Sequence, residues 1–130
     1  MIIRGTTPTH VFHIPFSIDG VVEAYVTYYQ DGRIVIDKRL EEIDVNVFDD
    51  KIRVNLTQED TLSFCCGRKY TDNIVIIQIK LLYENQIVCI SEPIREKVAD
   101  AIKDGRIYPD SSTIKPGDVI VYDGGGVEGY

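Results

Sequence analysis

Two carboxylates and two thiols lie close together near the middle of the chain. Glu59 and Asp60 stand within LTQEDTLSF, residues 56–64, and Cys65 and Cys66 follow directly. Carboxylates beside a thiol could act as an acid/base pair for a cysteine nucleophile, but such a thiol also needs a base such as histidine next to it. Both histidines belong to a distant predicted strand. We therefore expect no enzyme activity and no cofactor from this segment.

The same segment has a simpler interpretation as the start of a helical turn. Thr57 and Asp60 are three residues apart, which approximates a capping box in which each side chain accepts a hydrogen bond from the other residue's backbone N–H. We expect a single helical turn between two strands, capped by Thr57 and Asp60, with Leu62 and Phe64 directed into the core.

The spacing of the other potential metal ligands also argues against a metal site. His10 and His13 are three apart on a predicted strand, so their side chains should point to opposite faces. The acidic pairs match no twelve-residue calcium loop, and we expect them to lie in solvated turns. These pairs are Asp49 with Asp50 and Asp118 with Asp123.

The chain's composition limits the partners that it could bind. It has 130 residues, about one domain, and a formal net charge of −7 without any run of basic residues. Nucleic acids and anionic membranes both require clustered Lys and Arg, so neither is expected as a partner. We found no apolar run long enough for a membrane span or a signal peptide, and three cysteines do not suggest a disulfide framework.

Alternating apolar and polar residues predict seven strands. In residues 22–30, Val22, Ala24, Val26 and Tyr28 should share the buried face, and the turn Asp31-Gly32 should lead into a second alternating strand. Two more hairpins follow, with turns at Asp49-Asp50 and Glu84-Asn85. The predicted strands span residues 9–16, 22–30, 33–38, 43–47, 51–56, 73–83 and 86–91.

Residues 93–103 have no single interpretation from pattern alone. Ile94, Val98, Ala101 and Ile102 have helical spacing, whereas Ile94, Glu96 and Val98 also alternate as in a strand.

Two tyrosines stand out as interface candidates. Tyr25 and Tyr29 lie on the face opposite the apolar row of their strand, about 13 Å apart, where they could meet a sugar ring or another subunit. The alternative is cross-strand packing that shields the backbone.

These elements predict an all-β fold, an antiparallel, immunoglobulin-like β-sandwich of about seven strands with one short helical turn. The sandwich should occupy residues 1–107, and a Gly/Pro-rich extension should occupy residues 108–130. The extension contains one predicted strand, and its Gly124–Gly126 run is typical of a hinge. It could pair either with its own sandwich or, as an assembly arm, with a neighbouring subunit. The interface candidates in this strand are Val119, Ile120, Val121 and Tyr122.

Three segments resemble a known protein family. IIRGTTPTHVFHIPF, VNLTQEDTLSF and KDGRI together resemble small proteins encoded in prophages of gut Firmicutes, over roughly residues 2–107. The chain is also similar in size and pattern to the N-terminal domain of phage baseplate upper proteins. The resemblance implies a structural or assembly protein of the virion, and it favours a strand over a helix at residues 93–98. It brings no catalytic residues.

Two functional classes follow as expectations. The first is a virion protein of tail or baseplate type, made in the host cytoplasm and then carried in the particle, which forms a homo-oligomer and contacts other phage structural proteins. A capsid decoration or head-tail connector role belongs to the same class. The second is a stand-alone carbohydrate-binding module that uses Tyr25 and Tyr29 as a stacking platform.

Overall fold

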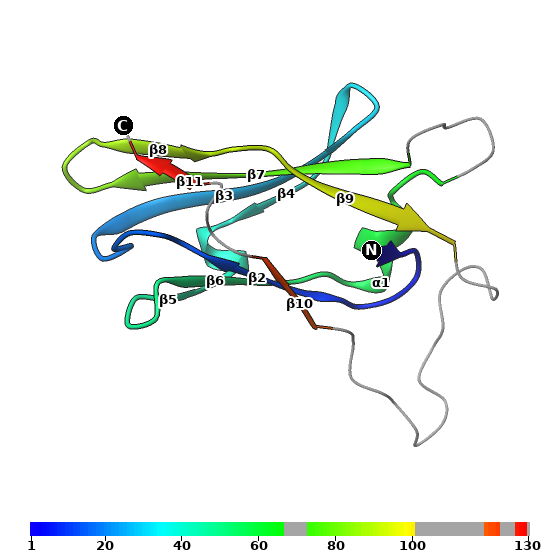
Figure 1. Cartoon of the computed structure of the whole chain (residues 1–130), viewed down its shortest axis with the longest axis horizontal. Helices are drawn as coiled ribbons and strands as arrows, with labels where there is room; N and C mark the ends of the chain where they lie inside the picture. The colour runs from blue at the N-terminus through cyan, green and yellow to red at the C-terminus, as the bar shows by residue number, and fades with distance from the viewer. Residues whose placement is uncertain (67–72, 101–118, 123–126, 130) are drawn as a thin grey trace, which may run out of the picture.

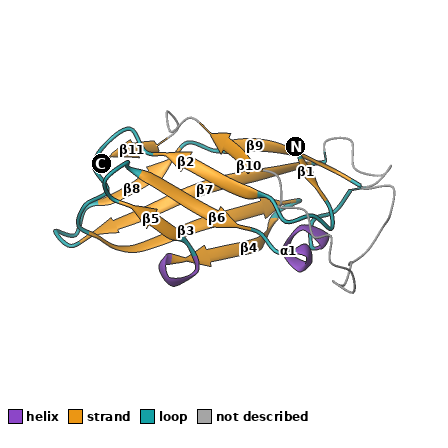
Figure 2. Cartoon of the chain, turned by 90° about the horizontal axis from the view of Figure 1, so that it is seen from below, coloured by secondary structure: helices purple, strands orange, loops and turns teal. Residues whose placement is uncertain are grey.

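The computed structural model describes residues 1–66, 73–100, 119–122 and 127–129, and in these ranges the chain forms two β-sheets packed face to face (Figure 1). The predicted β-sandwich is thus confirmed. Figure 2 shows the smaller sheet lying across the larger one.

The larger sheet has seven strands. Its order is β1 (Ile2–Ile3), β9 (Ile94–Ala99), β7 (Ile74–Tyr83), β3 (Val21–Gln30) and β4 (Arg33–Arg39), with β8 (Val88–Ser91) paired to β7 and β11 (Val127–Gly129) paired to β8. The smaller sheet has the order β10 (Val119–Tyr122), β2 (Thr9–His13), β6 (Lys51–Asn55) and β5 (Asp44–Asn46). A 3-10 turn, η1 (Leu40–Glu42), and a short helix, α1 (Gln58–Leu62), complete the described elements.

All seven predicted strands form, as β2 to β8, and four more join them. Residues 93–103, for which the pattern allowed a helix or a strand, form strand β9 as far as Ala99. Residues 101–103 lie outside the described part of the chain. The sheets are mixed rather than purely antiparallel, because β1 pairs parallel with β9 and β10 pairs parallel with β2.

The β3–β4 hairpin forms as its turn residues predict. Asp31 and Gly32 have φ values of 51° and 79°, the left-handed pair that a two-residue turn requires to match the twist of its strands.

The start of β3 departs from the expected alternation. The register with β7 shifts between Val21 and Glu23, as at a β-bulge. Val21 packs against the core and Val22 is 49% exposed, so the prediction that Val22 lies on the buried face was wrong.

β8 and β9 run along the same side of β7 and are separated by a break at Pro93. β8 pairs with residues 80–82 of β7, and β9 pairs with residues 74–77. At the break the Ser91 hydroxyl accepts a hydrogen bond from the Ile79 backbone N–H at 2.8 Å. The Ser91 side chain thus supplies an acceptor for β7 at the point where β8 ends.

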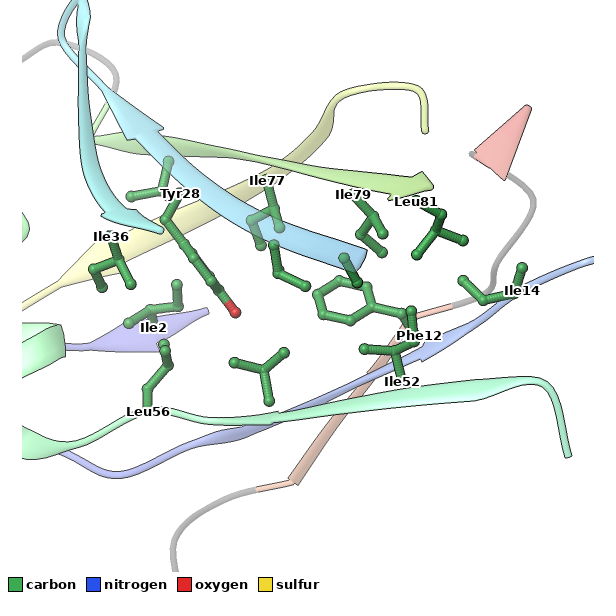
Figure 3. Close-up of a cluster of buried hydrophobic side chains, with 14 of the residues drawn as sticks. Ile2, Phe12, Ile14, Tyr28, Ile36, Ile52, Leu56, Ile77, Ile79 and Leu81 are labelled. Atoms are coloured by element: carbon green, nitrogen blue, oxygen red, sulfur yellow. The ribbon is translucent and has the colours of Figure 1, made fainter. Parts of the chain in front are cut away.

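The core lies between the two sheets (Figure 3). β3 and β7 contribute Ala24, Val26, Tyr28, Val75, Ile77, Ile79 and Leu81, and the smaller sheet contributes Phe12, Ile52 and Val54. Every one of these residues is at most 1% exposed. Burial of this apolar surface is the main favourable term that holds the layers together.

The predicted cap of α1 is confirmed. The Thr57 hydroxyl accepts from the Asp60 N–H at 3.0 Å, and the Asp60 carboxylate accepts from the Thr57 N–H at 2.9 Å. Phe64 is buried as expected, but Leu62 is only half-buried. Helical spacing turns Thr61, rather than Leu62, towards the protein.

α1 holds the N-terminal loop in place through the fully buried Thr61. The Thr61 hydroxyl accepts from the Gly5 N–H at 2.9 Å and donates to the Thr6 carbonyl at 2.8 Å. Gly5 has a φ of 83°, in the left-handed region that favours glycine. The RGTTPT and LTQEDTL segments, far apart in sequence, are therefore in direct contact.

Candidate protein-binding surface

The outer face of the larger sheet carries the tyrosines that the sequence singled out. Tyr25 and Tyr29 are on this face, as predicted, but their surroundings differ. Tyr25 is half-buried, and the guanidinium of Arg39 lies 5.5 Å from its ring centre. Tyr29 is 40% exposed. Because the Arg39 guanidinium covers the Tyr25 ring, only Tyr29 of the two tyrosines presents an open ring for stacking.

An apolar groove surrounds Tyr29 near the β3–β4 turn on this face. We call it the Tyr29 groove, and its volume is about 360 Å³. Such a volume is at the lower end of the range for ligand pockets, about 300–1,000 Å³. Its lining comes from β3, β4, β7 and the β8–β9 break, and consists of Thr27, Tyr29, Ile34, Ile76, Gln78 and Pro93.

Local irregularities in the strands shape this groove. A register shift in the β3–β4 pair places Ile34 opposite Tyr29 and Ile36 opposite Tyr28. Ile36 is therefore buried in the core, while Ile34 is 60% exposed on the outer face. The shift also makes β4 less able to pair with a further strand, because a bulge disturbs the regular row of hydrogen-bonding groups that such a strand would need.

Basic side chains are in excess on this face although the protein is acidic. The cross-strand pairs place Arg95 beside Ile76, Lys97 beside Ile74 and Lys80 beside Tyr25. With Arg39, which pairs with Glu23 at 3.3 Å, four basic side chains project from β4, β7 and β9 on this face, against two carboxylates, Glu23 of β3 and Asp37 of β4. Beside the Tyr29 groove, Arg95 and Lys97 are the cross-strand neighbours of Ile76 and Ile74, and Asp37 accepts a hydrogen bond from the lining residue Thr27 at 2.8 Å. These three residues carry a net positive charge in a chain whose net charge is −7.

Part of this surface could be predicted from the sequence. Tyr29 was an interface candidate, whereas Ile34, Ile76 and Pro93 were not. The available signal was the outward row of residues 74–83, which contains Ile74 and Ile76 where a solvated face would carry polar residues.

The C-terminal interface candidates pair within their own chain. Residues 119–122 form β10, whose partners in β2 run from Thr9 to Phe12. The Tyr122 ring stacks on Phe12 with 5.2 Å between ring centres. Residues 127–129 form β11, which pairs with β8. Of the two arrangements considered for the extension, the structure therefore shows the intrachain one, while residues 108–118 and the Gly124–Gly126 hinge lie outside the described part.

Two polar contacts join the sheets inside the core. His10 Nδ1 lies 2.6 Å from the Tyr28 hydroxyl, and the Tyr122 hydroxyl donates to Glu96 Oε2 at 2.6 Å. Burial lowers the pKa of His10 to about 4 and raises that of Tyr28 well above its usual value. Burial alone would raise the pKa of Glu96, but the Met1 ammonium and Tyr122 outweigh it and hold that pKa below its usual range.

The residues considered for thiol chemistry have structural contacts instead. Gln30 brackets Cys65 through two hydrogen bonds, donating to its carbonyl at 2.8 Å and accepting from its N–H at 2.7 Å. Asp60 caps α1 and also pairs with Lys38 at 3.0 Å. Cys65, Cys66 and Cys89 are free thiols. Within the described ranges, no three His, Cys, Asp or Glu side chains are grouped so as to hold a metal ion.

Searches against protein-family models, curated proteins and solved structures gave no match to this chain. Among the described residues no helix has the length and apolarity needed to cross a membrane.

Proposed function

We propose that this chain is a bacteriophage virion structural or assembly protein, of the tail or baseplate type, that acts through protein–protein contacts rather than catalysis. The observation that carries the proposal is the Tyr29 groove, an apolar hollow on the outer face of a sheet. Exposed apolar hollows of this kind are characteristic of binding surfaces. Aromatic side chains with an exposed ring are enriched in protein interfaces.

The fold and the sequence resemblance support the same function. A β-sandwich offers two broad outer faces on a rigid core, which suits a protein that must present a fixed surface to neighbours. The two segments that carry most of the resemblance, RGTTPT and LTQEDTL, contact each other through Thr61 and the N-terminal loop. Their shared role is thus to fix one corner of the scaffold. We further propose that the protein is made in the host cytoplasm and then carried in the particle.

The proposal can be tested on particles from the phage that encodes the chain. Purified virions should contain its peptides at a fixed ratio to the major tail protein, measured by quantitative mass spectrometry. A host protein of similar abundance is the control, and it should be depleted from the particles. Antibody labelling seen by electron microscopy should then place the protein on the tail. Recovery of the chain only in the particle-free fraction would refute a virion role.

The same phage can test the groove. Replacement of Ile34 by Glu puts a charge into the Tyr29 groove at a position that is already exposed, so the fold should persist while incorporation into particles falls. Ile87→Ala, at an exposed residue of another hairpin, is the matched control and should leave incorporation unchanged.

A further inference from the structure

The β5–β6 hairpin presents an apolar tip to solvent. Phe48 is 94% exposed and its neighbour Val47 is 43% exposed. An isolated exposed valine is ordinary, but a phenyl ring almost fully in water is a cost that a folded chain would normally avoid by burying it. We call these two residues the Phe48 tip.

The tip is held rigidly by its own loop. Asn46 Oδ1 accepts hydrogen bonds from the N–H groups of Phe48 at 3.0 Å and Asp49 at 3.3 Å, as in an Asx turn. Asp50 fastens the end of the loop to the body, because its carbonyl accepts from the Ile14 N–H at 2.8 Å and its carboxylate accepts from the Ile18 N–H at 3.1 Å. These hydrogen bonds fix the backbone that carries the ring, so little backbone entropy is lost when the tip binds.

The same molecule contains a hollow whose apolar lining suits the tip. The Tyr29 groove is apolar and lined by Tyr29, Ile34, Ile76 and Pro93, which suits an aromatic ring. The charges also match. Residues 41–50, which lead to the tip, carry five carboxylates and no Lys or Arg, whereas Arg95 and Lys97 are the cross-strand neighbours of Ile76 and Ile74 beside the groove.

The tip and the groove lie in different parts of the molecule. In Figure 1 the β5–β6 hairpin is at the lower left, and the β3–β4 turn, next to which Tyr29 and Ile34 lie, is at the upper right. They belong to different sheets, so one copy can use both at once.

We propose that the Phe48 tip of one copy docks in the Tyr29 groove of a second copy, so that the chain associates head to tail. This deepens the proposed function, on which it rests, by naming a second copy as the partner of the groove. A contact between two different surfaces repeats from copy to copy and produces a ring if it closes or a filament if it does not. This contact buries one phenyl ring and the residues around the groove. The buried area is smaller than the roughly 1,200 Å² of a standard interface, so free copies should associate weakly.

The test is sedimentation velocity of the full chain over micromolar to millimolar concentrations. The average mass of the native protein should rise with concentration. Phe48→Ala removes the tip and Ile34→Glu places a negative charge in the groove facing the acidic tip. Each variant alone should remain monomeric. Ile87→Ala, which removes a 43% exposed apolar side chain from another hairpin, should associate like the native chain.

Mixing the two variants separates head-to-tail docking from any symmetric contact. Phe48→Ala keeps an intact groove and Ile34→Glu keeps an intact tip, so the mixture should form a complex of one copy of each and grow no further. Circular dichroism of each variant should match the native spectrum.

Three outcomes would overturn the inference: a native chain that stays monomeric throughout, a Phe48→Ala variant that associates like the native chain, or a mixture that forms no complex. A monomeric chain that is nevertheless found in purified virions would overturn self-docking and leave the proposed function standing. Self-association of a chain that is missing from virions would support self-docking and overturn the proposed function.

Discussion

The His10 imidazole is fully buried between the sheets, next to Tyr28 and edge-on to the ring of Tyr122. Its Nε2 atom is buried and has no hydrogen-bond partner among the described residues. The buried environment therefore favours the neutral form of the His10 imidazole, because protonation would place an unsolvated cation in the core.

This burial predicts a loss of stability in mild acid. Below the unfolded pKa of 6.5 the unfolded chain takes up a proton on His10, whereas the folded protein does not do so until about pH 4. The unfolded state thus binds more protons in this window, and the free energy of unfolding falls as the pH falls. The difference in pKa corresponds to about 3 kcal/mol at full effect.

Urea unfolding at several values between pH 7 and pH 4 checks this prediction. His10→Gln removes the titration while retaining a hydrogen-bonding group for Tyr28, so its stability should depend less steeply on pH than that of the native protein. His13→Gln, which removes the other imidazole of the same strand, should keep the native slope. Equal slopes for the native chain and His10→Gln would show that another group governs acid unfolding.

At the scale of elements, α1 and the N-terminal loop behave as one unit because of a single hydroxyl. Thr61→Val keeps the shape of the side chain but leaves the Gly5 N–H and the Thr6 carbonyl without their partner. Buried groups left unsatisfied cost about 1–3 kcal/mol. We expect Thr61→Val to lower the free energy of unfolding by that amount in chemical denaturation.

The matched variant is Thr61→Ser, which retains the hydroxyl and loses only a methyl group. It should cost less than about 1 kcal/mol, the value of one buried methyl or methylene. If serine and valine destabilise the protein equally, packing rather than hydrogen bonding holds the loop.

Elements with local signals could be predicted from the sequence, and those with distant partners could not. The Asp31-Gly32 turn and the Thr57 cap depend on neighbouring residues, and both are confirmed. The bulge at Val22 depends on how β7 pairs with β3, so the periodicity of one strand gives no sign of it. The two-residue β1 is likewise too short to show a pattern before β9 lies beside it.

The same reasoning applies to the candidate surface. Tyr29 could be found from its strand, but the groove around it requires β3, β4, β7 and the β8–β9 break to come together. The Phe48 tip was missed because a single aromatic residue beside a predicted turn carries no periodic signal.

At the scale of the whole molecule, the C-terminal segment completes both sheets. β10 adds a strand beside β2 and places Tyr122 against Phe12, and β11 adds a strand beside β8. A chain that ends at Ile107 lacks both strands. We expect it to lose more than about 1.5–3 kcal/mol, the contribution of one large buried side chain, and to melt at a lower temperature.

A chain that ends at Tyr122 provides the control because it keeps β10 and lacks only β11. Its melting temperature in calorimetry should lie much closer to that of the full chain. If the two shortened chains melt alike, the contribution of residues 119–122 is negligible and the stacking on Phe12 does not stabilise the fold.

The parallel pairing of β2 with β10 also bears on how the chain folds as it leaves the ribosome. β2 is synthesised before β10, and the paired residues Thr9 and Val119 are 110 positions apart. Contacts between such distant segments form slowly, because a long loop must close before they contribute. Until β10 is made, the edge of β2 that β10 later covers is therefore exposed, and we expect the growing chain to be open there to pairing with another nascent chain.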